Sequence, residues 1–255
     1  MITQNQNGSL VTTIQNKIAT IEFGHPASNS FTKELLHRFT NEIQDLGNNP
    51  AVTVIVVKST GIGVFCAGAS LNELLLVSNE AEGTVFFSGF ADLINAMRTC
   101  PKIIIGRLQG KAVGGGVGIA AACDYVFATK TAFIKLSELA IGIGPFVIEP
   151  AVSRKIGITA MTELTLAAQE WKSADWAKEK GLYTHTFVKI EDLDHELTNF
   201  STSIARYNPE ALAEIKKVLW EGTEHWETLL QERAVISGKL ILSEHSKKIL
   251  AHFKK

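Results

Sequence analysis

Two glycine-rich segments, each following a run of β-branched residues, constrain this chain more than any other feature of its sequence. The first is GIGVFCAGASL at residues 61–71, and the second is QGKAVGGGVGIAAACD at residues 109–124. Glycine and alanine leave the backbone uncovered, so a ligand atom can come close to a main-chain N–H group. Such N–H groups stabilise developing negative charge without reorganising. We therefore expect the two segments to form two halves of one oxyanion site, suited to chemistry at a carbonyl group.

Apolar runs around these segments predict an α/β fold. Residues 52–59 (VTVIVVKS) and 102–108 (KIIIGRL) are continuous apolar runs, typical of strands buried on both faces of a parallel sheet. Helical spacing of apolar residues predicts a helix over residues 31–46, ended by Gly47, and another from about 80 to 98. Strands that alternate with helices in this order imply right-handed crossovers and a mainly parallel sheet, at least as far as a strand at residues 125–128.

The two ends of the chain differ in character. Residues 10–14 and 18–23 alternate well enough to predict an N-terminal hairpin with its turn at residues 15–17. After Pro150 only residues 183–188 look extended, and helices are predicted over residues 160–168, 173–180, 191–207, 209–220, 225–237 and 243–253. We therefore divide the chain into an α/β core, residues 1–195, and a helical C-terminal region, residues 196–255, whose apolar stripes must pack on the core or on another subunit.

Composition fits an ordinary globular enzyme and argues against several other classes. The chain has 255 residues, of which 45% are hydrophobic and 20% charged, with a formal net charge of −1. Its longest basic cluster is a lysine pair, so we expect no nucleic-acid partner. The polar N-terminus resembles no leader peptide, and no stretch reaches the roughly twenty apolar residues of a membrane span. We expect a cytoplasmic protein.

Cysteine and histidine spacing gives no indication of disulfide or metal chemistry. Cys66, Cys100 and Cys123 are widely spaced in apolar or glycine-rich surroundings, which favours reduced, buried thiols. Cys66 lies inside the first glycine-rich segment and is conceivable as a nucleophile, but no histidine stands near it in the sequence. The seven histidines show no HxxxH or HExxH spacing, so no metal site is expected.

Three ordered motifs resemble those of the enoyl-CoA hydratase/isomerase (crotonase) family: FCAGASL, KIIIGRLQGKAVGGGVGIAAACDYVFAT and AFIKLSELAIGIGP. The resemblance extends through nearly the whole chain and includes HPASNSF and SADWAKEKGLYTHTF. It implies the ClpP/crotonase fold, with repeated ββα units, a mainly parallel sheet and a helical C-terminal region. It also implies an acyl-CoA substrate with no separate cofactor, and a homotrimer or a hexamer (a dimer of trimers) with the C-terminal helices at the trimer interface.

Carried over by position, the resemblance places the oxyanion donors on the N–H groups of Ala69 and Gly115. Gly115 would begin a predicted helix over residues 114–122, where free N–H groups and the helix dipole both favour an enolate oxygen. CoA is expected along the first segment, with Lys58 as an additional contact and Lys254 and Lys255 near a phosphate of a neighbouring subunit's CoA. The expected substrate-binding residues are Cys66, Ala67, Gly68, Gly114, Gly118 and Phe146.

Only one of the two acidic positions used in the family's acid/base chemistry carries an acidic residue in this chain. Glu138 in KLSELAIGIG matches one acidic position, although Ser137 stands where the family commonly has proline. Its apolar neighbours should raise the carboxyl pKa and suit a catalytic base. The other acidic position falls on Gly118, which carries no proton-transferring group. Glu149 or Glu73 could replace the missing carboxylate.

A single base favours double-bond isomerisation of an enoyl-CoA through an oxyanion-stabilised enolate. Alternatives are an enoyl-CoA hydratase, for example of a branched ester such as methylglutaconyl-CoA, an acyl-CoA decarboxylase or other lyase, and a CoA-ester binding protein without activity. The glycines could also serve packing alone in an assembly subunit. Dinucleotide binding is disfavoured, because the fingerprint that begins at Gly114 and Gly116 would need a third glycine at Ile119. The acyl chain itself is left open.

Overall fold

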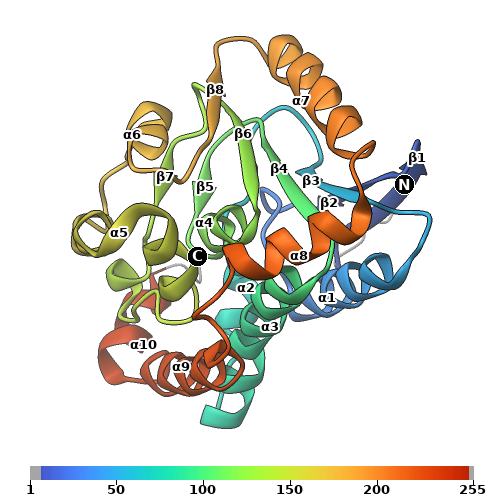
Figure 1. Cartoon of the computed structure of the whole chain (residues 1–255). Helices are drawn as coiled ribbons and strands as arrows, with labels where there is room; N and C mark the ends of the chain where they lie inside the picture. The colour runs from blue at the N-terminus through green and yellow to red at the C-terminus, as the bar shows by residue number, and fades with distance from the viewer. Residues whose placement is uncertain (1–6, 253–255) are drawn as a thin grey trace, which may run out of the picture.

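A six-stranded sheet organises the computed structural model, which describes residues 7–252 of the chain (Figure 1). The strand order is β1-β2-β3-β4-β6-β8, with β1 and β2 antiparallel and every other neighbouring pair parallel. The strands are β1 (Ser9–Gln15), β2 (Ile18–Gly24), β3 (Val54–Ser59), β4 (Ile103–Leu108), β6 (Tyr125–Thr129) and β8 (His185–Phe187). The mainly parallel sheet and the N-terminal hairpin predicted from the sequence are both confirmed.

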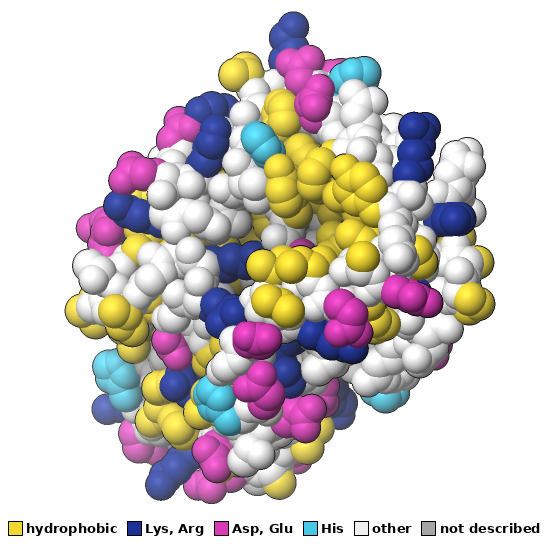
Figure 2. All heavy atoms as spheres, in the orientation of Figure 1, with side chains coloured by type: hydrophobic (Ala, Val, Ile, Leu, Met, Phe, Trp, Pro, Cys, Tyr) yellow, Lys and Arg dark blue, Asp and Glu magenta, His cyan; other side chains and the backbone are white. Residues whose placement is uncertain are grey.

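Residues of β3 show why the sheet needs helices on both faces. Its side chains alternate, and all four from Val54 to Val57 are at most 4% exposed. Ile55 and Val57 pack into the core on the side of α1 (Lys33–Asn48), α3 (Glu80–Thr99) and α4 (Gly115–Ala122). Val54 and Val56 pack against α7 (Ile190–Ile204) on the other face. Figure 2 shows hydrophobic side chains gathered beside the place that α7 has in Figure 1. The continuous β-branched run therefore belongs to a strand covered on both sides, as predicted.

A second, smaller sheet lies beside the first. It consists of β5 (Ala112–Val113) and β7 (Ile134–Lys135), which pair in parallel. Single bridges extend it on both edges, from Cys66 to Ala112 and from Ile134 to Lys172. The element orders β1-β2-α1, β4-β5-α4 and β6-β7-α5, in which α5 spans Glu149–Leu166, repeat a ββα unit, as the resemblance implied.

The C-terminal half is helical and packs on the core. Helix α9 (Trp226–Leu240) lies against α3 at a point where a Cβ added to Gly83 would come within 2.8 Å of the Gly238 Cα. Figure 1 shows α9 beside α3, with α10 (Glu244–Ala251) next to α9. Among residues 7–252, no helix combines the length and apolar character needed to cross a membrane. The remaining helices are α2 (Leu71–Leu74), a 3₁₀ turn η1 (Leu139–Ile141), α6 (Ala174–Glu179) and α8 (Pro209–Leu219).

Two helices differ from their predicted bounds. Helix α1 continues past Gly47 to Asn48, and Asn49 caps it through an N–H bond to the Leu46 carbonyl. Helix α5 (Glu149–Leu166) consists of two helical segments joined at Gly157, whose φ of +76° and ψ of 158° are not helical. The second segment corresponds to the helix predicted over residues 160–168, whereas the first, which has Pro150 in its first turn, was not predicted. The predicted division at residue 195 falls inside α7; that division and a trimer interface formed by the C-terminal helices remain predictions.

Helix α8 is fixed to the sheet by a buried ion pair. The Lys216 Nζ lies 3.0 Å from Asp124 Oδ2 and also donates to the carbonyls of Met97 and Lys102. The Lys216 side chain is 2% exposed and that of Asp124 is 8% exposed. Asp124 also accepts the Trp220 indole N–H at 2.7 Å. This network joins α8 to the carboxyl-terminal end of α3 and the loops around β4 and β6.

Replacing Lys216 with Met should destabilise the fold by about 3 kcal/mol, because Asp124 then keeps a buried charge without its cation. The neighbouring Lys217→Met is the matched control, since the Lys217 side chain is 69% exposed and its removal should matter little. Urea unfolding followed by circular dichroism at neutral pH measures both. Equal unfolding midpoints for the two variants would show that the buried pair does not hold α8.

Candidate active site

The first glycine-rich segment presents an unused backbone amide. Gly68 has a φ of +86°, in the left-handed region that glycine adopts readily. On either side of Ala69 the chain pairs with Phe31: the Phe31 N–H donates to the Gly68 carbonyl at 2.8 Å, and the Ser70 N–H donates to the Phe31 carbonyl at 2.8 Å. Within residues 7–252 the Ala69 N–H itself donates no hydrogen bond. It is therefore available to a ligand.

The second glycine-rich segment supplies another such amide at the start of α4. Gly114 caps the helix with a φ of +51°, and Gly115 is the first helical residue, whose N–H has no intrahelical acceptor. No other acceptor in the described part of the chain takes this N–H. A Cβ added to Gly68 would lie 3.5 Å from the Gly115 nitrogen, so the two segments touch beside these amides. The structure thus brings together the regions of Ala69 and Gly115.

The glycines serve packing as well. A Cβ on Gly116 would lie 2.7 Å from the Cys66 Cβ, and one on Gly115 would lie 2.2 Å from the Phe90 ring. A side chain at Gly116 would push α4 away from the first segment, and one at Gly115 would push α4 away from α3. The same glycines therefore let the two segments approach each other and leave their N–H groups uncovered.

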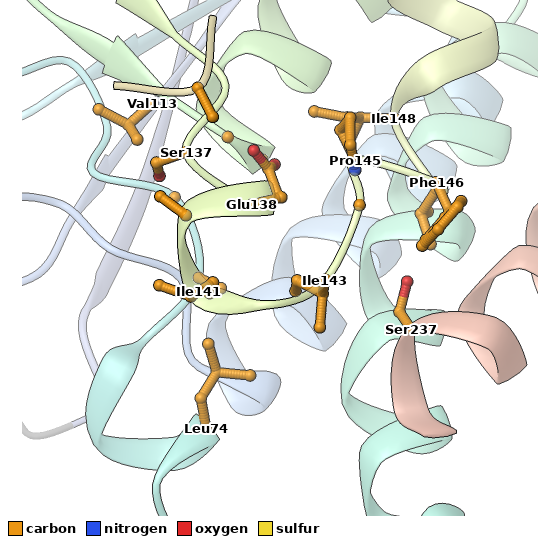
Figure 3. Close-up of a pocket in the computed structure, with 18 of the residues that line it drawn as sticks. Leu74, Val113, Ser137, Glu138, Ile141, Ile143, Pro145, Phe146, Ile148 and Ser237 are labelled. Atoms are coloured by element: carbon orange, nitrogen blue, oxygen red, sulfur yellow. The ribbon is translucent and has the colours of Figure 1, made fainter. Parts of the chain in front are cut away.

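A cavity of about 510 Å³ opens at this junction, within the size range of small-molecule sites (Figure 3). Ala69 and Gly115 both line it. Figure 3 shows Glu138 projecting into the space between Val113 and the loop that carries Pro145 and Ile148. Most of the remaining wall is apolar, formed by residues such as Leu71, Leu74, Phe87, Phe90, Ile141, Ile143 and Val147.

Glu138 is the acidic group of this cavity. Its Oε2 atom is buried and has no hydrogen-bond partner among the described residues. Burial raises the pKa of Glu138 from its ordinary value of 4.5 to about 7. Oε1 lies only 2.8 Å from where a Cβ of Gly114 would stand, so the carboxyl group rests against the residue that caps α4. A carboxyl group with a pKa near 7 can both accept and donate a proton at neutral pH.

Ile148 occupies the space that a side chain at position 118, the family's other acidic position, would need. Gly118 lies one turn inside α4, and a Cβ added there would come within 2.4 Å of the Ile148 Cγ2 atom. Ile148 is 4% exposed and lines the cavity, whereas Gly118 does not. Among the described residues of the cavity wall, Glu138 is the only acid.

The two glutamates that could replace the missing carboxylate form hydrogen bonds outside the cavity. Glu149 accepts a hydrogen bond from Arg233 at 2.5 Å and another from the Ser153 hydroxyl at 2.5 Å. Glu73 accepts the Lys33 N–H at 2.7 Å, at the start of α1. Neither glutamate lines the cavity. The structure therefore places neither of them opposite Glu138.

The other residues expected at the site divide into two groups. Ala67, Gly68, Gly114 and Phe146 line the cavity, whereas Cys66 does not. Burial raises the pKa of the Cys66 thiol to about 12, which makes a nucleophilic role for it unfavourable.

Three lysines were expected near CoA. Lys58 is ion-paired with Glu22 at 2.5 Å. Lys254 and Lys255 lie outside the described residues.

Several cavity residues were missed by the sequence reasoning. Lys135 lies on β7, three residues before Glu138, and alternation along that strand could have identified it as facing the same side as Ser137. Gln169 follows α5 and Ser237 belongs to α9, and both also line the cavity. No local pattern indicates Ser237, because only the packing of α9 on α3 brings it there.

The C-terminal helices hold the loop that follows Glu138. The buried Ser246 hydroxyl in α10 donates to the Gly142 carbonyl at 3.1 Å. Arg233 in α9 donates to the Phe146 carbonyl at 3.4 Å and to Glu149, at the start of α5. Both ends of residues 142–149 are thus tied to the C-terminal region, which gives that region a part in shaping the cavity.

The chain resembles known proteins over most of its length. The family model described as enoyl-CoA hydratase/isomerase matches residues 13–254. The peroxisomal Delta(3,5)-Delta(2,4)-dienoyl-CoA isomerase of Arabidopsis thaliana is 26% identical over 211 residues, which cover 77% of this chain and 74% of that protein. The mitochondrial methylglutaconyl-CoA hydratase of Homo sapiens is 28% identical over 200 residues, covering 77% of this chain and 58% of that protein.

Solved structures show the same fold. The crystal structure of enoyl-CoA hydratase from Bacillus halodurans superposes with a TM-score of 0.88 at 22% sequence identity, covering 95% of this chain and 99% of that one. This likeness confirms the crotonase-like fold predicted from the sequence. With the family model matching nearly all of its length, the chain belongs to the enoyl-CoA hydratase/isomerase family of acyl-CoA enzymes.

Proposed function

We propose that this protein moves the double bond of an enoyl-CoA ester between the 3- and 2-positions, with Glu138 as the only acid/base group. The observation that carries the proposal is the composition of the cavity wall: one carboxyl group with a raised pKa, beside two backbone amides that have no other acceptor among the described residues. Such a site can form an enolate and return the same proton to a different carbon.

In the forward direction the Glu138 carboxylate removes a proton from C2 of a 3-enoyl thioester. The C2–H electron pair moves toward the carbonyl, and the oxygen of the resulting dienolate accepts hydrogen bonds from the N–H groups of Ala69 and Gly115. Protonated Glu138 then donates its proton to C4, which leaves the double bond between C2 and C3. No atom is gained or lost, and the base is regenerated.

Hydration has less support in this cavity. Addition of water across a 2-enoyl thioester is easiest with two carboxylates that hold the water between them. Here the second position is Gly118, covered by the apolar side chain of Ile148. An apolar group beside the reacting carbons gives a water molecule few hydrogen-bond partners. Isomerisation needs no such water.

Removing the carboxylate should slow the reaction strongly. We expect Glu138→Gln to lower turnover of a 3-enoyl-CoA by about 10²–10⁴-fold, the usual contribution of a general base, while leaving ester affinity nearly unchanged. Glu80→Gln, an exposed position in α3, is the control and should turn over normally. Products from 3-enoyl-CoA and 2-enoyl-CoA are identified by chromatography and mass. A gain of one water from 2-enoyl-CoA, without any double-bond migration, would contradict the proposal.

The same substitution should change stability in a pH-dependent way. Because the folded-state pKa of Glu138 is raised to about 7, its ionisation destabilises the fold progressively as pH rises from 4.5 to about 7. Gln carries no charge, so Glu138→Gln should be more stable than the parent at pH 8, by up to about 3 kcal/mol, and no more stable for this reason at pH 4. Thermal unfolding across this pH range measures the difference. A pH-independent difference would mean that the buried carboxyl does not titrate as described.

Position 118 offers a test of what excludes hydration. Gly118→Glu combined with Ile148→Ala places a carboxylate where Ile148 stood, and we expect this double variant to hydrate 2-enoyl-CoA measurably. Gly118→Gln with Ile148→Ala is the matched control without the acid. Gly118→Glu alone should unfold more easily, since overpacking costs about 1–3 kcal/mol. If the parent protein already hydrates as fast as the double variant, the role given to Ile148 is wrong.

A further inference from the structure

The smaller sheet forms part of the cavity wall and extends past the edge of the cavity. Val113 on β5 pairs directly with Lys135 on β7, and both side chains line the cavity. Lys111 precedes Val113 by two residues, so alternation along an extended chain places it on the same face. Trp171 comes from the segment that bridges the other edge of β7. Lys111, Lys135 and Trp171 therefore belong to one surface next to the site.

Two lysine side chains meet the same indole ring. The Lys111 Nζ lies 4.7 Å and the Lys135 Nζ 4.5 Å from the centroid of Trp171. The two ammonium groups are consequently no more than about 9 Å apart. Contact with an aromatic face holds a lysine in position but does not neutralise its charge.

Neither lysine has an anionic partner in the described part of the chain. Neighbouring lysines do: Lys130 pairs with Asp175, and Lys172 pairs with Glu163 and Glu170. No carboxylate lies within ion-pair distance of Lys111 or Lys135 among residues 7–252. Two like charges held near each other repel, and an anion bound close to both is attracted by each of them.

We propose that Lys111, Lys135 and Trp171 form a binding site for an anionic group of the thioester in the cavity, either a carboxylate or a phosphate. The inference rests on the proposed function only in that a thioester occupies the cavity. Lysine ammonium groups donate charge-assisted hydrogen bonds to both kinds of oxygen. Two sources share this chemistry: a carboxylate at the far end of the acyl group, and the phosphates of CoA.

Equilibrium binding separates the two sources. The background is Glu138→Gln, so that no ester is consumed. The probes are pentanoyl-CoA and glutaryl-CoA, which have acyl chains of equal length without and with a terminal carboxylate, and the pantetheine thioesters of the same two acids, which lack phosphates. Isothermal titration calorimetry gives the dissociation constants for Lys111→Met and Lys135→Met in this background.

Lys130→Met is the control, because it removes a nearby lysine whose charge is already paired with Asp175. Lys135→Arg keeps the charge and should retain affinity. If the anion is the acyl carboxylate, Lys135→Met weakens both glutaryl esters by about three- to tenfold and leaves both pentanoyl esters unchanged. If it is a phosphate, both CoA esters weaken and neither pantetheine ester does.

The site is refuted if Lys111→Met and Lys135→Met bind all four esters as tightly as their background protein while Lys130→Met does the same. The lysines would then only cover the Trp171 ring. Hydration of 2-enoyl-CoA without double-bond migration would overturn the proposed function and leave this site standing. A cavity that takes no thioester looks different, because then none of the esters binds even to the protein with Glu138 intact. That result would overturn the site along with the function.

Discussion

A carboxyl group withdrawn from water and left without a hydrogen-bond partner is the constraint on which this site depends. Ionisation of Glu138 is unfavourable where it stands, as the rise of its pKa to about 7 shows. The surrounding fold must supply the free energy that keeps it there. In exchange, the group can take up and release a proton at neutral pH, and the nearby amides of Ala69 and Gly115 can stabilise negative charge that forms on a bound carbonyl. Forming an enolate needs both kinds of group: a carboxylate that takes the proton and amides that stabilise the negative charge.

Different layers of the fold hold these groups together. The Ala69 amide is set by pairing between the first segment and Phe31, and the Gly115 amide by the start of α4. Glu138 follows β7 of the smaller sheet, and the loop after it is tied to α9 and α10 through Arg233 and Ser246. A change in the C-terminal helices can therefore alter the cavity without touching a reacting group. The same cavity wall excludes a second acid through the contact of Ile148 with Gly118.

Much of the fold could be predicted because its signals are local. The β-branched run of β3 and the spacing of apolar residues in α1 and α3 follow from period and burial alone. Motif resemblance pointed to Glu138, Ala69 and Gly115, and all three line the cavity, while their catalytic roles stay predictions. Contacts between distant segments could not be predicted: nothing near Gly118 in the sequence shows that Ile148 covers it, and nothing near Trp171 shows that lysines from two different strands reach its ring. Those contacts depend on how the layers of the fold pack together, and no short stretch of the sequence shows that packing.

The proposed formation of an enolate by Glu138 can be measured with a substrate that has no double bond to move. A saturated acyl-CoA in deuterated buffer has an exchangeable C2 hydrogen, and nuclear magnetic resonance records its replacement by deuterium. We expect the protein to catalyse this exchange and Glu138→Gln to abolish it. Exchange at equal rates in the two proteins, or at the uncatalysed rate in both while the ester is bound, would contradict the assignment of Glu138 and the two amides as an enolate-forming site.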